Sequence, residues 1–215
     1  MYLSRLILNP LSRQVQQEIA NPYQMHRTIL HAFPQDLRAN GERVLFRVDA
    51  LPRTGQLHLL VQSQGKPDWT WLASRDGRRP YLAASDRPNP AVKQTDLQLA
   101  AGQVLAFRLL ANPTKRLGKS FGPDKGKRVG LYTAEEQMAW LQRKADQSGF
   151  TVLTAVPAAA AKIADRTKGV ELLSVRFDGL LQVQQPDTVL EAVRNGIGSG
   201  KAFGFGMLSV ARPLQ

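Results

Sequence analysis

The sequence predicts an α+β protein built from two ferredoxin-like (RRM-like) units in tandem, each with the order strand, helix, strand, strand, helix, strand. Segments with apolar residues at alternate positions, typical of strands, are interleaved with segments whose apolar residues recur every three or four positions, typical of helices. The second half repeats the element order of the first half. A chain of 215 residues, 43% of them hydrophobic, can bury two such cores. We therefore expect one unit at residues 1–112, a basic linker at 113–128 and a second unit at 129–215.

The first unit is expected to begin with a strand at residues 2–9, followed by a short helix at residues 12–20. The step from Asn21 to Pro22 interrupts this helix and starts another. Asparagine is a good N-cap, and proline suits the first helical position because it lacks the N–H that would be left unpaired there. Apolar residues then recur every four positions up to Phe33, so the second helix is expected to end at that residue, before a proline.

The rest of the first unit is predicted to be mainly strands. Residues 42–51 and 56–64 read as two strands joined by a turn, which is typical of a hairpin. Residues 65–99 carry only a weak helix or loop signal. Residues 103–113 read as a further strand, which we expect to close the first unit.

The second unit begins with a clear helix signal. Thr133 and Glu136 form a capping box, and apolar residues line one face as far as Gln147. The remaining expected elements are strands at residues 150–156, 170–177, 179–183 and 204–210 and a helix at 188–195.

The charge of the chain points to a polyanionic partner. Its 29 Lys and Arg residues face 17 Asp and Glu residues, which gives a net charge of +12. No apolar run is long enough to span a membrane, so nucleic acid is favoured over a membrane surface. The absence of cysteine excludes thiolate chemistry and cysteine-ligated zinc, and three histidines make a histidine-rich metal site unexpected. We expect a cytoplasmic protein with no metal and no cofactor.

Tyr23 and His26 are the candidate reactive groups. They are three residues apart and therefore neighbours on one helix face, beside the buried stripe and not at its centre. They also lie near the helix N-terminus, where the dipole favours a bound phosphate and a neutral imidazole. A neutral His26 could take a proton from a ribose 2′-hydroxyl while Tyr23 orients the phosphate or assists the leaving oxygen. Spacing alone favours a structural pair at a domain interface over a reactive pair.

A glycine-rich segment, residues 196–206, precedes the last expected strand. It is not a Walker A loop, because that motif requires glycine where Asn195 stands and Ser or Thr where Ala202 stands. Two interpretations remain. Its backbone, with Gly196, Gly198 and Gly200, could approach RNA closely and present Lys201 to a phosphate, or it could form a tight turn packed against a helix.

Two further segments carry clustered cations. The linker holds Lys115, Arg116, Lys119, Lys125, Lys127 and Arg128, and the connection between two strands of the second unit holds Lys162, Arg166 and Lys168. Basic loops are usually only solvated, but phosphate contacts supply much of the affinity for nucleic acid. No aromatic signature for single-strand stacking is present on the expected strands, which favours duplex or hairpin RNA.

Six segments in the same order resemble the CasE family, the CRISPR RNA processing endoribonucleases of the type I-E Cascade complex. They are MYLSRLILNP, NPYQMHRTILHAFP, RLLANPTKR, AEEQMAWLQRK, LLSVRFDGLLQV and GIGSGKAFGFGMLSVARP. The resemblance implies two ferredoxin-like domains that bind the hairpin of a CRISPR repeat. It also implies metal-free cleavage at the 3′ base of that hairpin, leaving a 2′,3′-cyclic phosphate and a 5′-hydroxyl.

The resemblance also implies roles for particular residues. The catalytic histidine and tyrosine of the family match His26 and Tyr23, and its glycine-rich loop matches residues 196–206. Arg27 and His31 lie on the same helix and could touch RNA, and residues 162–168 would correspond to a hairpin that enters the RNA groove. The expected partners are the repeat hairpin and the other Cascade subunits.

Two hypotheses of different classes compete with cleavage. One is a non-catalytic scaffold subunit that binds the RNA hairpin through the same basic loops, with Tyr23 and His26 as interface residues. The other is a nucleotide-dependent enzyme that uses the glycine-rich loop, which the mismatches to known nucleotide motifs oppose.

Overall fold

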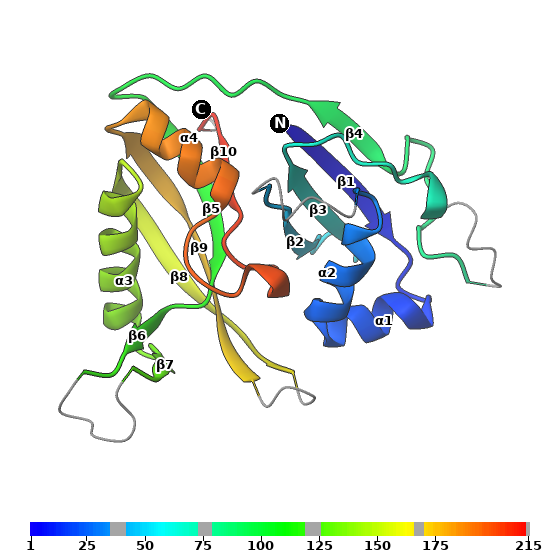
Figure 1. Ribbon diagram of the computed structural model, residues 1–215, viewed down its shortest axis with the longest axis horizontal. Coiled ribbons are helices and arrows are strands. Elements are labelled where there is room, and N and C mark those ends of the chain that lie inside the picture. Colours follow the sequence, from blue (N-terminus) through cyan, green and yellow to red (C-terminus); the bar gives the residue numbers. More distant parts are fainter. Residues whose placement is uncertain (35–41, 73–78, 119–125, 166–169, 214–215) are drawn as a thin grey trace. The chain divides into compact units, whose positions relative to one another are not determined.

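The computed structural model describes residues 1–34, 42–72, 79–118, 126–165 and 170–213, and its strands and helices divide into two compact units (Figure 1). The first unit comprises Met1–Leu97 and Lys201–Met207, and the second comprises Gln98–Gly200 and Leu208–Gln215. Each unit contains helices and one four-stranded sheet, and every described strand pair is antiparallel. The predicted α+β class is confirmed.

The first unit has the sheet order β2-β3-β1-β4. Its elements are β1 (Tyr2–Leu8), α1 (Arg13–Ala20), α2 (Pro22–Leu30), β2 (Leu45–Ala50), β3 (Leu57–Ser63), the 3₁₀ turn η1 (Thr70–Leu72) and β4 (Ala91–Gln94). The central strand β1 pairs with β3 from Tyr2 opposite Ser63 to Leu8 opposite Leu57. Alternation along β1 places Leu6 and Leu8 in a core that also contains Met25 and Ile29 of α2. The face of α2 opposite to these two residues is thereby turned away from the core.

The predicted helix break is confirmed. The backbone N–H of Asn21 closes α1 on the carbonyl of Gln17, and α2 starts at Pro22. This helix ends at Leu30, three residues earlier than expected. The N–H groups of the next three residues, as far as Phe33, bond to carbonyls three positions back, so the α-helical ladder gives way to tighter turns.

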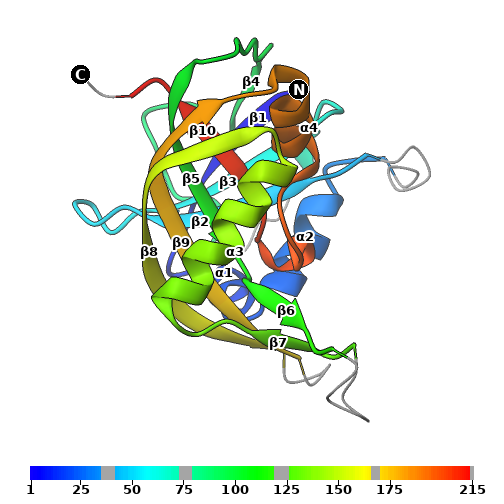
Figure 2. The same ribbon diagram turned by 90° about the vertical axis from the view of Figure 1, so that its left-hand side faces the viewer.

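The second unit has the sheet order β10-β5-β9-β8. Its elements are β5 (Val104–Ala111), β6 (Thr114–Arg116), β7 (Arg128–Gly130), α3 (Ala134–Gln147), β8 (Phe150–Asp165), β9 (Val170–Val183), α4 (Pro186–Asn195) and β10 (Leu208–Ala211). Figure 2 looks onto α3, which packs against β8. The predicted cap of α3 is confirmed, because Thr133 Oγ1 accepts a hydrogen bond from the backbone N–H of Glu136 at 3.2 Å.

The prediction that residues 103–113 close the first unit is wrong. This strand is β5, and it pairs with β9 and β10 in the sheet of the second unit. The fourth strand of the first sheet is instead β4, within the stretch that carried only a weak signal. An alternating apolar pattern specifies a strand but not its partner. The expected linker also differs from the structure, because residues 113–128 belong to the second unit and contain β6.

Three glycines explain where β9 and β10 depart from expectation. Gly179 does not end β9. It pairs with Ala155, next to a bulge in β8, at a place where a β-carbon would collide with the carbonyl oxygen of Thr154. The last strand starts at Leu208 and not at Gly204. The positive φ angles of Gly204 and Gly206, 83° and 90°, are incompatible with an extended strand.

The helices of the described residues are all too short or too polar to cross a membrane.

Candidate active site

The first turn and a half of α2 carries the two residues expected to react. Tyr23 and His26 are both half-buried, whereas Met25 between them is fully buried. Their ring centroids are 6.4 Å apart, with an angle of 28° between the ring planes. The predicted arrangement of two partly exposed neighbours beside the buried stripe is thus confirmed as geometry.

Two further aromatic rings enclose this pair. Phe203 lies 5.7 Å from Tyr23, and Phe46 lies 6.0 Å from His26, measured between ring centroids. We call these four residues the ring cluster. All four belong to the first unit, because Lys201–Met207 is part of it. Sequence reasoning missed both phenylalanines. The one feature of the sequence that could have pointed to Phe203 is its place inside the glycine-rich segment, two residues after Lys201.

The N-cap residue of α2, Asn21, does not cap the helix with its side chain. Its Oδ1 atom is buried without a hydrogen-bond partner. The first turn carries no acidic residue. The positive end of the helix dipole therefore faces the surroundings of Tyr23 without a local carboxylate to neutralise it, a setting that favours a phosphate.

The ring cluster can perform proton transfer. A neutral imidazole can accept a proton from a hydroxyl, and a phenol can donate a hydrogen bond to a phosphate oxygen. Among the described residues, no group of three or more His, Asp or Glu side chains is placed to hold a metal ion.

The other two predicted contacts on this segment are both exposed. Arg27 lies in the last turn of α2, and His31 caps that helix at its C-terminal end. The His31 ring lies 5.6 Å from the ring of Trp71, at an angle of 49°. Neither side chain is part of the ring cluster.

A buried carboxylate supports α2 from beneath. Glu18 of α1 is 4% exposed and accepts three hydrogen bonds, from Gln14 Nε2 at 2.7 Å, Thr28 Oγ1 at 2.6 Å and the Tyr81 hydroxyl at 2.7 Å. Because Thr28 belongs to α2, this network ties the two helices together. This network was not predictable from the sequence, since a lone acid on an amphipathic helix is usually solvated.

Four cations of the expected linker, Lys115, Arg116, Lys127 and Arg128, lie on or next to a small two-stranded ribbon. We call β6, β7 and the adjoining Lys127 the basic ribbon. Lys115 donates a hydrogen bond to Glu136 at 3.0 Å, and this bond is the main reason that the pKa of Glu136 is below its usual value. Arg116 lies directly opposite Arg128 and both are exposed. Like charges facing each other across strands repel, so this ribbon is poised for an anion.

Lys162, on β8, lies beside an exposed tyrosine. Its Nζ atom is 2.7 Å from Glu171 Oε1 and 5.8 Å from the ring centroid of Tyr132, whose exposed fraction is 61%. The hydrogen bond to Glu171 raises the pKa of Lys162. The remaining predicted contacts, Lys119, Lys125, Arg166 and Lys168, lie outside the described residues.

The glycines that follow α4 adopt backbone conformations open mainly to glycine. Gly196, Gly198 and Gly200 have φ angles of 73°, 81° and 81°. A β-carbon on Gly198 would lie 3.1 Å from Trp140 of α3, so this position is closely packed against a helix. That packing supports the tight-turn interpretation at Gly198, while contact of these glycines with RNA stays a prediction. Lys201 starts the 3₁₀ turn η3 (Lys201–Phe203).

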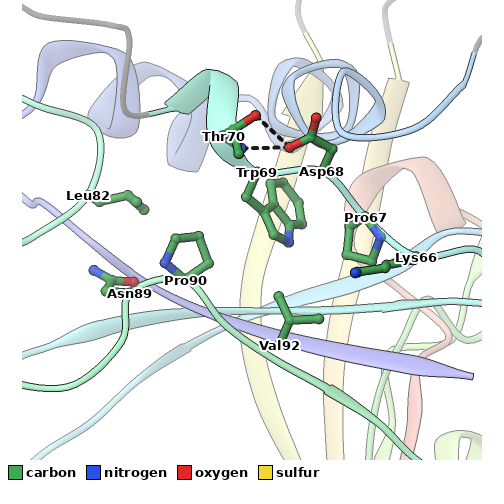
Figure 3. A pocket seen from close by; sticks show the side chains of 9 residues that line it. All are labelled: Lys66, Pro67, Asp68, Trp69, Thr70, Leu82, Asn89, Pro90 and Val92. Carbon is green, nitrogen blue, oxygen red and sulfur yellow. Dashed lines mark hydrogen bonds between the residues drawn. The ribbon is translucent and has the colours of Figure 1, made fainter.

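A cavity of about 600 Å³ lies elsewhere in the first unit (Figure 3). The residues that line it are Lys66, Pro67, Asp68, Trp69, Thr70, Leu82, Asn89, Pro90 and Val92. Two hydrogen bonds from Thr70 to Asp68 Oδ1, at 2.6 and 2.9 Å, lower the pKa of Asp68. None of the predicted site residues lines this cavity.

Comparison with known proteins gives one consistent result. The family described as "CRISPR associated protein" matches residues 1–212. The chain is 36% identical to the CRISPR-associated endoribonuclease Cse3 of Thermus thermophilus, over 98% of this chain and 100% of that protein. It is 30% identical to the CRISPR system Cascade subunit CasE of Escherichia coli, over 98% and 99% of the two chains. A structure of Thermus thermophilus Cse3 bound to an RNA representing a pre-cleavage complex matches with a TM-score of 0.83, covering 98% of both chains.

Proposed function

The chain belongs to the Cse3/CasE family of CRISPR endoribonucleases, and from this premise we propose that it cleaves the repeat hairpins of precursor CRISPR RNA without a metal ion. The observation that carries the proposal is the pairing of half-buried Tyr23 and His26 at 6.4 Å on the first turns of α2. RNA supplies its own nucleophile, so a base and an acid at this spacing suffice for the reaction.

The proposed reaction is an internal transfer of the phosphate. His26 takes the proton of the ribose 2′-hydroxyl, and O2′ attacks the adjacent phosphorus. The bond between phosphorus and O5′ of the next nucleotide breaks as the new bond forms. The departing O5′ takes a proton from Tyr23 or, where Tyr23 only orients the phosphate, from water, so the products carry a 2′,3′-cyclic phosphate and a 5′-hydroxyl. The uncapped N-terminus of α2 stabilises the charge that develops on the phosphate oxygens.

The same protein is proposed to retain its product hairpin and to bring it into Cascade. The Escherichia coli relative is named as a Cascade subunit, and the Thermus thermophilus relative has been solved bound to RNA. The exposed cations of the basic ribbon support binding of a phosphate backbone, with Arg27, His31, Lys162 and Lys201 as further contacts.

Both units are proposed to be ferredoxin-like. When the strands of each four-stranded sheet are numbered by their order along the chain, both sheets read 4-1-3-2, which supports the assignment. The second helix of the first unit would then be reduced to the 3₁₀ turn η1.

A cleavage assay with a labelled repeat hairpin tests the function. The wild-type protein should cut in EDTA as fast as in magnesium, and mass spectrometry of the 5′ fragment should detect the cyclic phosphate. His26→Ala should reduce cutting by roughly 100-fold or more while the dissociation constant for the hairpin stays nearly constant. His58→Ala is the matched control, because His58 is also half-buried in the first unit but lies outside the ring cluster.

Two results would contradict the proposal. Cutting that stops in EDTA refutes the metal-independent mechanism. A wild-type protein that shifts the hairpin without cutting it is instead a scaffold subunit.

A further inference from the structure

The 3₁₀ turn η3 is the least expected part of the site. Residues 196–200 and Leu208 belong to the second unit, but Lys201–Met207 between them belongs to the first. Within that unit, η3 contacts both α2 and β2, the two elements that carry the reactive pair and Phe46. The glycine-rich segment thus places the turn η3 in contact with α2, the helix that carries Tyr23 and His26.

The two ends of the ring cluster meet at this turn. Phe203 lies against Tyr23, with ring planes at 35°, and Phe46 lies against His26, with ring planes at 30°. Gly204, the residue after Phe203, touches Phe46, because a β-carbon there would lie 3.2 Å from Phe46 Cε2. The Tyr23 and His26 rings are therefore each flanked by a further ring, and the backbone at Phe203 and Gly204 contacts both ends of the cluster.

We propose that Phe203 and Gly204 are positioning residues that fix the Tyr23 phenol and the His26 imidazole in the reactive arrangement. This inference rests on the proposed function. Phe203 packs directly on the phenol. Gly204 acts through Phe46, because its missing side chain lets the turn approach that ring, which is 1% exposed and lies against the imidazole.

Glycine is required at position 204 for two separate reasons. Its φ angle of 83° is one that residues with a β-carbon rarely adopt, and the space toward Phe46 is already filled. Phe205, the next residue, is fully buried and holds the far side of the turn in the core. In this part of the glycine-rich segment, the glycine serves packing against the reactive helix and not the approach of a phosphate.

The expected size of the effect follows from the chemistry. A half-buried ring that loses its packing neighbour samples other orientations, and proton transfer depends on hydrogen-bond geometry. Misplacement of a reacting group by about 1 Å can cost roughly 100-fold in rate. Binding of the hairpin depends mainly on phosphate contacts elsewhere, so its affinity should be nearly unaffected.

The test compares substitutions of two phenylalanines in the same unit. Phe203→Leu removes the ring that packs on Tyr23, and Phe33→Leu removes a buried ring that packs on Trp69, outside the ring cluster. Phe203→Tyr is the rescue variant, because it retains the ring. For each protein we would measure the single-turnover cleavage rate at saturating protein, and the dissociation constant of a hairpin with a 2′-deoxy cleavage site. We would also record the nuclear magnetic resonance signals of the histidine rings, which report on the surroundings of His26.

Phe203→Leu should lower the single-turnover rate by roughly 10- to 100-fold and shift the His26 signal. The dissociation constant of the hairpin should change by less than about twofold. Phe203→Tyr should restore most of the rate, and Phe33→Leu should change neither the rate nor the signal. Gly204→Ala should lower the rate at least as much as Phe203→Leu. If Gly204→Ala does not fold, the Phe203 variants decide alone.

Three outcomes overturn the inference. An unchanged rate in Phe203→Leu refutes the positioning role but leaves the proposed function intact. If Phe203→Leu raises the dissociation constant of the hairpin but leaves the rate at saturating protein unchanged, Phe203 is an RNA contact and not a positioning residue. A wild-type protein that does not cut refutes the proposed function, and the positioning role with it.

Discussion

The ring cluster of the first unit and the basic ribbon of the second are built in opposite ways. In the ring cluster, the proposed reactive groups, Tyr23 and His26, are half-buried and each lies against a further aromatic ring. In the basic ribbon the cations are exposed, and Arg116 faces Arg128 across the strands. Reaction requires one fixed geometry, whereas contact with phosphates requires charge and reach. Substitutions in the ring cluster should therefore change the rate of cutting, and substitutions in the ribbon should change affinity.

The largest effect outside the histidine itself is expected from Tyr23→Phe. This variant keeps the ring that packs between Phe203 and His26 but removes the hydroxyl. If the phenol assists the leaving oxygen, the single-turnover rate should fall by roughly 100-fold, with the dissociation constant unchanged. The measurement is a rapid-quench time course at saturating protein. Full activity in Tyr23→Phe, together with loss of activity in Tyr23→Ala, would assign Tyr23 a purely packing role.

The basic ribbon should give the opposite pattern. The double variant Arg116→Gln/Arg128→Gln removes the facing guanidinium groups, so it should weaken binding at 0.15 M salt by roughly tenfold and reduce the slope of log Kd against log salt by about 1.5. The saturating rate should not change. Because the two charges repel each other in the free protein, its melting temperature should not fall.

A charge-matched control distinguishes the effect of these two positions on affinity from the effect of net charge alone. Arg53→Gln/Arg87→Gln removes two exposed arginines of the first unit that are outside every predicted contact. An equal loss of affinity in both double variants would show that only net charge matters, and it would end the comparison between the two regions.

Local features of the chain were predictable from the sequence. The break at Asn21 and the cap at Thr133 were both correct, because each depends on hydrogen bonds and φ preferences within a few residues. Tyr23 and His26 were placed correctly beside each other for the same reason, since three residues of helix fix their spacing.

Features that depend on residues distant in sequence were not predictable. The pattern of β5 identified a strand but could not tell which sheet it joins. Phe46 and Phe203 are separated by most of the chain, so no periodicity connects them to His26. The role of Glu18 could not be predicted, because its partner Tyr81 lies 63 residues away in the sequence and approaches it only in the folded protein.

A smaller effect on the reaction, and a larger one on stability, is expected where Glu18 supports α2. Tyr81→Phe removes one of three donors to this buried carboxylate, so the free energy of unfolding should fall by about 1–3 kcal/mol. The saturating rate at 25 °C should stay near that of the wild type, because the rings themselves are untouched. Urea denaturation measures the change. Tyr2→Phe is the matched control, since its hydroxyl bonds to Gln94 at an exposed site and its loss should be hard to detect.

The smallest effect concerns the pH dependence of stability and distinguishes His58 from His26, the proposed base. The pKa of His58 is below its usual value of 6.5, mainly because burial penalises its charged form and secondarily because Arg5 lies nearby; Asp49 partly offsets this. As the pH is lowered below 6.5, the unfolded chain therefore takes up a proton at His58 before the folded protein does. The free energy of unfolding decreases over this range until the pH reaches the pKa of His58 in the folded protein. His58→Gln should remove this loss, which urea denaturation at pH 7.5 and pH 5.5 would measure. The pH dependence of the cleavage rate should be the same in His58→Gln and in the wild type, because the proposed base, His26, lies in the ring cluster and His58 does not. A change in that profile would instead connect His58 to the chemistry and contradict the assignment of His26 as the base.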